Sequence, residues 1–206
     1  MNAVAVSPSR SARVPTVAQH EAAAPRISPG DADARFRSVV LPHLDDAYAL
    51  ARWLTGNRVD SEDVVQDACL RALRGIGNFS SDNARAWVLT IVRHTTYSWL
   101  QKNRPAAGVL EAFESVDGTQ TVEFDAETPE TTLIARDDLT LLNAAIAALP
   151  MPLRETLVLR EIQELSYQEI ADVTGVPIGT VMSRLARARG RIISIMTRVG
   201  HDGADR

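Results

Sequence analysis

The chain has 206 residues, of which 45% are hydrophobic, and its formal net charge is −4. This length predicts one or two domains, and the acidic balance argues against a protein that coats nucleic acid without selectivity. Cys69 is the single cysteine, which excludes an internal disulfide framework and a cysteine-rich zinc site. No apolar run is long enough to span a bilayer, so we expect a cytoplasmic protein without membrane insertion.

The first part of the chain predicts a tail followed by helices. Residues 1–31 are rich in Ala, Ser, Pro and Val without periodicity, which is typical of a disordered tail. Residues 32–56 carry an apolar stripe at helical spacing, and Pro42 should divide or bend this stretch. Gly56 is expected to end it, because glycine accepts the left-handed geometry found after a helix.

Residues 60–74 predict a helix that begins at Asp60 or Ser61. Its core face is expected to include Leu70 and Leu73. Three polar residues share its outer face: Asp63, Gln66 and Asp67. Helix-dipole stabilisation and i,i+4 ion pairing would explain this outer face without any partner molecule.

A glycine-containing loop over residues 75–83 leads into a predicted helix over residues 84–103. The exposed side of this helix has a positive bias. Tyr97 and Trp99 either stack on unpaired bases or pack in the core, and the sequence leaves both open. His94 has no partner at metal-ligand spacing, so we expect neither a metal site nor a cofactor.

The chain changes character after residue 104. Residues 105–136 accumulate Asp and Glu among Pro and Gly, which predicts a flexible acidic linker. Two amphipathic helices follow, over residues 137–149 and 153–164. They should pack with the next two helices as a four-helix domain, and residues 199–206 form a polar tail.

A helix-turn-helix motif lies in the stretch SYQEIADVTGVPIGTVMSRLARARGR, residues 166–191. Ser166 and Glu169 have the spacing of a capping box, which satisfies two backbone amides at a helix start. Gly175 should end that helix, and Thr180 should cap the next one, whose residues 180–192 would face the major groove of DNA.

The outer face of that second helix reverses the sign of the chain's net charge. It carries four arginines and no acidic residue: Arg184, Arg187, Arg189 and Arg191. A local basic stripe in an acidic chain is the electrostatic pattern expected of a DNA-binding surface.

Two separated segments together resemble one protein family. DSEDVVQDACLRAL followed by NARAWVLTIVRHTTYSWLQKNRP resembles the sigma-factor domain that binds core RNA polymerase and reads the −10 promoter element. LPMPLRETLVLREIQELSYQEIADVTGVPIGTVMSRLARAR resembles the domain that reads the −35 element. The chain is thus similar to the extracytoplasmic-function (ECF) class of the sigma-70 family. The resemblance implies an all-α fold of two small helical domains, region 2 at 32–104 and region 4 at 137–198, joined by the acidic linker.

The resemblance also assigns roles to individual residues. Those matching the polymerase-binding positions are Asp63, Gln66 and Asp67. Those matching the loop and helix that bind the melted −10 strand are Asn78, Phe79, Ser80, Ser81, Asp82, Asn83, Arg85, Arg93 and His94. Those matching −35 base or phosphate contacts are Thr180, Met182, Ser183, Arg184, Ala186 and Arg187. The family often has Lys or Arg at position 182 and a larger residue at 186, so the −35 preference is expected to differ.

The implied function is promoter-specific initiation of transcription as a subunit of RNA polymerase, with no catalysis by this chain alone. Its expected partners are the β′ and β subunits of core polymerase, promoter DNA and an anti-sigma factor. Two alternatives remain at this point. One is a LuxR-like regulator that binds operators without joining polymerase, and the other is a helical enzyme, for which no paired carboxylates or nucleophile motif is present.

Overall fold

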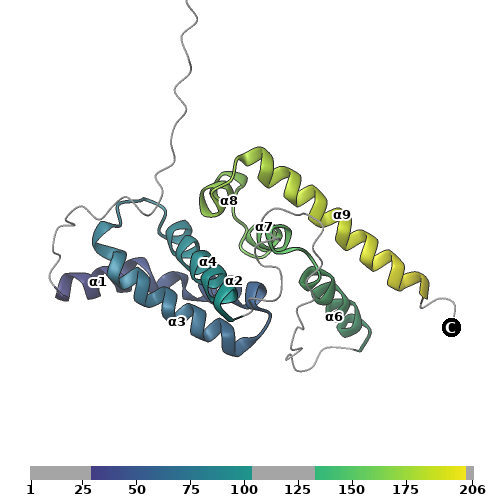
Figure 1. The fold of residues 1–206 in the computed structure, drawn as a ribbon, viewed down its shortest axis with the longest axis horizontal. Coiled ribbons are helices and arrows are strands. Elements are labelled where there is room, and N and C mark those ends of the chain that lie inside the picture. Colours follow the sequence, from purple (N-terminus) through teal and green to yellow (C-terminus); the bar gives the residue numbers. More distant parts are fainter. Residues whose placement is uncertain (1–28, 104–132, 203–206) are drawn as a thin grey trace, which may run out of the picture.

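The fold consists of two groups of helices (Figure 1). The computed structural model describes residues 29–103 and 133–202, and within these ranges it contains helices and no strand. The first group comprises α1 (Pro29–Val39), α2 (Leu44–Thr55), α3 (Arg58–Gly75) and α4 (Ala84–Asn103), with short 3-10 helices at Leu41–His43 and Ile76–Asn78. The second comprises α6 (Leu133–Ala147), α7 (Met151–Glu161), α8 (Tyr167–Thr174) and α9 (Ile178–Asp202). The all-α prediction is confirmed.

Three predicted segments lie at least partly outside the described residues: the tail 1–31, the linker 105–136 and the tail 199–206. The first half of the last one, residues 199–202, still belongs to α9, so that helix is longer than predicted. Each helical group also begins a few residues earlier than expected, at Pro29 and at Leu133. Within the described ranges no helix has the length and apolar character needed to cross a membrane.

Proline and glycine divide the first group where the sequence predicts. A 3-10 helix that contains Pro42 separates α1 from α2. The proline ring lacks a backbone N–H, so the α-helical hydrogen-bond ladder cannot continue through it. Gly56 ends α2 with φ 87°, a left-handed conformation, and its N–H donates to the carbonyl of Arg52 at 2.9 Å.

The predicted start of α3 is wrong by a few residues. Asn57, rather than Asp60 or Ser61, is the N-cap: its side-chain oxygen accepts a hydrogen bond from the backbone N–H of Asp60 at 2.8 Å. The amide nitrogen of Asn57 also donates to the Asp60 carboxylate at 2.6 Å. An asparagine that follows a helix-ending glycine can therefore begin the next helix at once, with no loop between them.

The second group contains the predicted helix-turn-helix. Ser166 and Glu169 form both hydrogen bonds of the capping box, and Gly175 ends α8 with φ 70°. The next helix, α9, begins at Ile178, so Thr180 lies in its first turn and is not the cap. The backbone N–H of Thr180 donates to the carbonyl of Pro177 at 2.8 Å, so the helical hydrogen bonding has already begun at Thr180.

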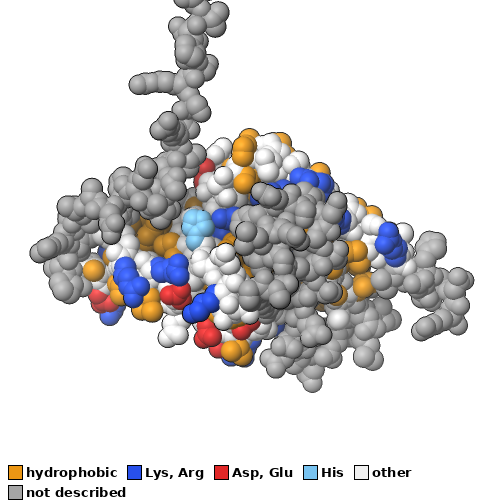
Figure 2. Space-filling view, in the orientation of Figure 1, with side chains coloured by type: hydrophobic (Ala, Val, Ile, Leu, Met, Phe, Trp, Pro, Cys, Tyr) orange, Lys and Arg blue, Asp and Glu red, His pale blue; other side chains and the backbone are white. Residues whose placement is uncertain are grey.

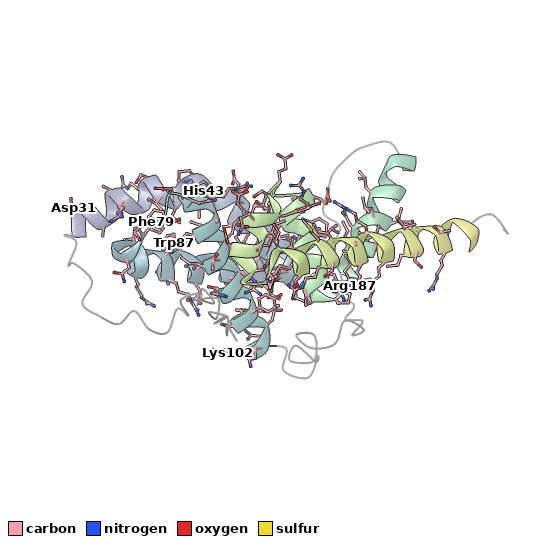
Figure 3. All side chains as sticks on the ribbon, turned by 90° about the horizontal axis from the view of Figure 1, so that it is seen from above. Asp31, His43, Phe79, Trp87, Lys102 and Arg187 are labelled. Atoms are coloured by element: carbon pink, nitrogen blue, oxygen red, sulfur yellow. The ribbon has the colours of Figure 1, made fainter. Side chains whose placement is uncertain are left out.

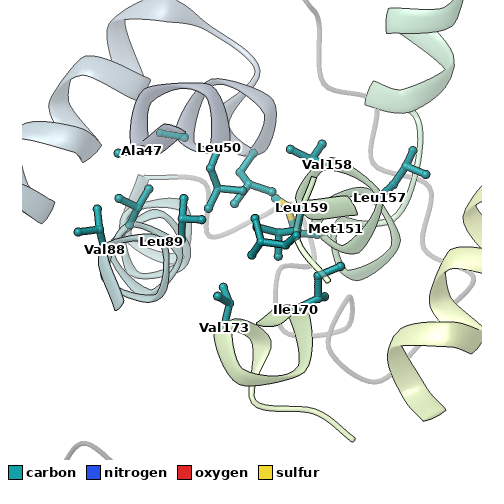
Figure 4. Packing of buried hydrophobic residues seen from close by; sticks show 14 of the residues in the cluster. Ala47, Leu50, Val88, Leu89, Met151, Leu157, Val158, Leu159, Ile170 and Val173 are labelled. Atoms are coloured by element: carbon teal, nitrogen blue, oxygen red, sulfur yellow. The ribbon is translucent and has the colours of Figure 1, made fainter. Parts of the chain in front are cut away.

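The two groups pack directly on each other. Helix α2 packs against α7, and α4 packs against α8. Four fully buried side chains meet across this contact: Leu50, Leu89, Leu159 and Val173. Figure 4 shows the first two pointing away from α2 and α4 toward the helices of the second group. The apolar core is therefore continuous through both groups.

Candidate nucleic-acid and polymerase interfaces

The outer face of α3 is an exposed stripe of mixed character. Asp63 and Gln66 are exposed, and Asp67 is half-buried beside Arg71, with an ion pair of 2.9 Å. Because these residues recur at helical spacing, they point in one direction.

The same stripe continues with two leucines that the sequence analysis placed in the core. Leu70 is 48% exposed and Leu73 is 43% exposed, so that prediction is wrong. Small residues do the inward packing instead, since Ala68 and Ala72 are buried. An acidic and apolar stripe, named here the α3 stripe (Asp63, Gln66, Asp67, Leu70 and Leu73), has the mixed chemistry of a protein-binding surface.

The loop between α3 and α4 is anchored by one aromatic residue. Phe79 is half-buried, with its ring 4.8 Å from that of Trp87, and the two lie side by side in Figure 3. Arg35 donates a hydrogen bond to the Phe79 carbonyl and approaches its ring. The polar residues around it are exposed: Asn78, Ser80, Ser81 and Asp82. The loop thus presents polar groups from a fixed aromatic base.

Asn83 joins this loop to both helical groups. Its side-chain oxygen accepts a hydrogen bond from the backbone N–H of Ala86 at 2.9 Å, at the start of α4. Its amide nitrogen donates to Glu169 Oε1 on α8 at 3.0 Å. Hydrogen bonds from Ser166 and Asn83 lower the pKa of the Glu169 carboxyl.

Arg85 lies in a second contact between the groups. Its guanidinium donates to both carboxylate oxygens of Asp46 on α2, at 2.6 and 3.1 Å, and to Gln163 Oε1 at 3.0 Å. Gln163 follows α7, is 2% exposed, and donates to the backbone carbonyl of Asp46 at 3.0 Å. The hydrogen bond with Asp46 is the main cause of the raised pKa of Arg85.

Arg93 is more enclosed than Arg85, with side-chain exposures of 11% and 34%. Its Nε donates to Glu155 Oε1 on α7 at 2.6 Å, with side-chain exposures of 11% for Arg93 and 0% for Glu155. Tyr97 donates from its hydroxyl to Glu155 Oε2 at 3.2 Å, and the guanidinium lies 4.9 Å from the Tyr97 ring centre. Burial raises the pKa of Glu155, and the Arg93 guanidinium opposes that rise.

Desolvation shifts the pKa values of two residues on neighbouring turns of α4, His94 and Tyr97. His94 is exposed as a residue, yet partial desolvation and the charges of Arg93 and Arg71 lower its pKa, which favours the neutral imidazole. Burial, followed by the charge of Glu155, raises the pKa of Tyr97 well above its ordinary value. Tyr97 is half-buried, and its hydroxyl contacts Glu155, so the second group covers part of the side chain. Among the described residues no cluster of His, Cys, Asp and Glu could hold a metal ion.

The face of α9 predicted to read the −35 element is open. Met182 is 49% exposed, and Ser183, Ala186 and Arg187 are exposed as well. Figure 3 labels Arg187 on the outer side of this helix, and Figure 2 shows basic side chains along it. Arg187 bonds only weakly to its own helix, through Ser183 O at 3.2 Å.

Three further residues of α9 are half-buried or paired. Arg184 is half-buried, and Thr180 is half-buried in the first turn. Arg189 forms an ion pair with Glu161 of α7 at 2.6 Å. Four predicted −35 residues thus form one exposed face, and Thr180 and Arg184 are half-buried at its edge. The predicted −10 residues are divided between a largely exposed loop and α4, on which Arg85 and Arg93 contact the second group and His94 is exposed.

Sequence reasoning missed three residues of the covered surface: Asp46, Glu155 and Gln163. Each is far along the chain from the arginine that it contacts, with Arg93 and Glu155 separated by 62 positions. One signal was available. Glu155 lies inside the run LRETLVL, where it is an acidic residue in a segment that is apolar at Leu153 and from Leu157 to Leu159.

Comparison with known proteins agrees with both halves of the chain. Residues 39–105 match the family model for sigma-70 region 2, and residues 139–192 match that for sigma-70 region 4. The RNA polymerase sigma-H factor of Pseudomonas aeruginosa is 33% identical over 172 residues, which cover 81% of this chain and 88% of that protein. The ECF RNA polymerase sigma-E factor of Escherichia coli K12 is 32% identical over 171 residues, with the same coverage of 81% and 88%.

Two solved structures of similar fold are also sigma-factor matches or support the same fold. The sigma factor RpoE of Bartonella quintana, crystallised in complex with the anti-sigma factor NepR, matches with a TM-score of 0.62 and 31% identity. The match covers 79% of this chain and 96% of that one. CnrH, in complex with the cytosolic domain of CnrY, matches with a TM-score of 0.57 at 22% identity and supports the fold alone.

These findings decide between the alternatives left by the sequence. A LuxR-like regulator requires a sensing domain before its helix-turn-helix, and region 2 of sigma factors occupies that part of this chain. The region 4 match covers the helix-turn-helix itself. The chain belongs to the ECF sigma factors of the sigma-70 family, which are alternative sigma factors of bacterial RNA polymerase.

Proposed function

We propose that this sigma factor binds core RNA polymerase through the α3 stripe and directs initiation at promoters whose −35 element is read by α9. The observation that carries the proposal is the open basic face of α9 in a chain whose net charge is −4. Such a local concentration of arginine favours one contact with DNA over general adhesion to it.

The −35 contact follows from the side chains on that face. Arg187 is exposed and can offer two N–H groups to the O6 and N7 atoms of guanine, a pairing worth about 1–3 kcal/mol of discrimination. Met182 and Ala186 are exposed and apolar, so they suit a thymine methyl group better than a polar base edge. Arg184 and Thr180 lie beside this face, where they would contact phosphate.

The −10 contact belongs to region 2. The exposed loop from Asn78 to Asn83 would receive an unpaired base, and the basic side of α4 would hold the backbone of the melted strand. Extruding a base costs a few kcal/mol, so stacking and hydrogen bonds in the loop must offset that cost. Phe79 and its contact with Trp87 give the loop a rigid base for this task.

Polymerase binding would use the α3 stripe. Its carboxylates fit a basic partner surface, and its two exposed leucines fit an apolar one. Regulation by an anti-sigma factor is the further part of the proposal. It is supported by the relative RpoE of Bartonella quintana, whose structure was solved with NepR.

The decisive experiment is run-off transcription with purified core RNA polymerase on sheared genomic DNA from the source of the protein. We expect discrete transcripts that require this protein, and alignment of their start sites would reveal the two promoter elements. Core polymerase alone is the control. Absence of new transcripts, together with footprints of the free protein on duplex DNA, would contradict the proposal and favour an operator-binding role.

A further inference from the structure

The buried ion pair between the two groups lies on the surface assigned to promoter DNA. Glu155 of region 4 receives hydrogen bonds from Arg93 at 2.6 Å and from the Tyr97 hydroxyl at 3.2 Å. Both donors belong to α4 in region 2. The carboxylate is completely buried, so it fills the space in front of these donors.

The two donors form a site for an anionic oxygen group. A guanidinium beside a tyrosine hydroxyl binds carboxylate and phosphate oxygens by the same charge-assisted hydrogen bonds. A phosphate of single-stranded DNA therefore has the chemistry to replace the Glu155 carboxylate. It cannot do so while region 4 remains packed on region 2, because no part of the Glu155 side chain is exposed.

Two further contacts cover the same surface. Asn83 donates to Glu169, and Arg85 donates to Gln163. Together with Arg93, three residues that the family resemblance assigns to the −10 strand are each bonded to a residue of region 4. All three residues therefore face region 4 in the packed arrangement.

We propose that Arg93 and Tyr97 form a phosphate site of the promoter strand and that the chain's own Glu155 occupies it when the two domains are packed together. The proposal rests on the function proposed above. Region 4 thus competes with the melted strand for one anion site, and strand binding requires the domains to separate. An intact Glu155 lowers the fraction of molecules that can bind single-stranded DNA.

Removing the carboxylate should shift this balance. Glu155→Gln leaves the Arg93 guanidinium buried without a counter-ion, a state that disfavours the packed arrangement. The apparent dissociation constant varies inversely with the binding-competent fraction, so opening the domains tightens binding.

The experiment uses the full chain and a fluorescein-labelled single-stranded DNA of twelve nucleotides with random sequence. A random sequence is suitable because phosphate contacts do not depend on the base. Fluorescence anisotropy should give an affinity about tenfold higher for Glu155→Gln than for the wild type. Small-angle X-ray scattering should show a larger radius of gyration for the same variant.

Asp172→Asn is the matched control. It also removes one negative charge from region 4, but Asp172 is exposed and bonds to Gln168 on its own helix. It should leave both readouts at the wild-type values. The double variant Glu155→Gln with Arg93→Ala should lose the gain in affinity, because the anion site is then gone.

A second variant covers the case in which Glu155→Gln misfolds, as judged by circular dichroism. Gln163→Ala removes two contacts between the groups and leaves the anion site intact, so it should also raise affinity and the radius of gyration. If the folded variants bind DNA no more tightly than Asp172→Asn, the competition does not exist.

Run-off transcription separates this result from the function proposed above. Protein-dependent transcripts without a gain in affinity for Glu155→Gln would overturn the competition and leave the sigma-factor role intact. A gain in affinity without transcripts would support the competition and contradict the promoter function.

Discussion

Two glutamates of α7 show how position on one helix decides what a carboxylate does. Glu155 is completely buried against Arg93 of region 2, whereas Glu161 is 47% exposed and pairs with Arg189 within region 4. An exposed pair of this kind contributes little to stability. A buried charge is costly without its partner, so Arg93 and Glu155 depend on each other.

Arg187→Ala should reduce transcription from a promoter that depends on its −35 element by roughly 5- to 150-fold, the equivalent of about 1–3 kcal/mol. The reason is the loss of two hydrogen bonds to one guanine, since Arg187 is exposed and bonds only to its own helix turn. Single-round transcription on wild-type and −35-mutated promoters measures the effect. Arg198→Ala, exposed further along α9, is the control and should be near normal.

The lowered pKa of Glu169 predicts a dependence of stability on pH. Because its folded-state pKa lies below the ordinary glutamate value of about 4.3, the carboxylate stabilises the fold at higher pH. That contribution is lost as the pH falls from the ordinary value through the lowered one. Urea denaturation measures the free energy of unfolding at neutral and acidic pH. On acidification this free energy should fall less for Glu169→Gln than for the wild type. An equal fall of the free energy of unfolding in both proteins would contradict the stabilising role of the Glu169 carboxylate.

Helix α3 shows how one element serves packing and partner binding at once. Its inward side relies on small and branched residues such as Val64, Ala68 and Ala72, which are buried. Its larger leucines face solvent as part of the α3 stripe. Hydrophobic periodicity alone could not separate these two uses, since both sides of the helix carry apolar residues.

The double substitution Leu70→Ala and Leu73→Ala should weaken binding to core polymerase while leaving the fold stable. Both side chains are more than 40% exposed, so their removal should change the free energy of unfolding by less than about 1 kcal/mol. Surface plasmon resonance with core polymerase measures binding, and urea denaturation measures stability. Val59→Ala is a suitable control, because Val59 is 68% exposed and lies outside the stripe. A large loss of stability with unchanged binding would contradict the proposed role of the two leucines in polymerase binding and indicate a role in core packing.

At the scale of the whole molecule, charge is divided between surfaces. The chain is acidic overall, but the outer face of α9 carries basic residues, and Arg85 and Arg93 are matched by Asp46 and Glu155. In the packed arrangement these two arginines of region 2 are therefore neutralised internally, whereas Arg187 on α9 stays exposed.

Promoter binding by the assembled polymerase should fall steeply as salt rises, and Arg184→Ala should make the logarithmic slope shallower by about 1. The reason is that one phosphate contact fewer releases one counter-ion fewer. Filter binding between about 50 and 200 mM salt measures the slope. Arg37→Ala, on an exposed residue of α1 that pairs with Asp33, should keep the wild-type slope. An unchanged slope for Arg184→Ala would contradict a phosphate contact by Arg184.

Local signals in the sequence determined most of the helices of this protein. Pro42, Gly56, the Ser166–Glu169 capping box and Gly175 act through the backbone of their immediate neighbours, so their effect can be predicted without tertiary structure. Errors arose where two local signals compete. At Asn57 and at Ile178 the helix begins earlier than the favoured capping residue suggested.

Only the tertiary structure decided which exposed-looking residues are covered. The sequence predicts Arg85 and Arg93 on the exposed side of α4 and leaves Tyr97 open, but region 4 packs on that side. Long-range pairs such as Arg93 with Glu155 have no local signature, because the chain brings them together only when Leu50 and Leu89 bury against region 4. The residue type determines which groups can donate or accept a hydrogen bond. The partner of each group depends on how whole helices pack.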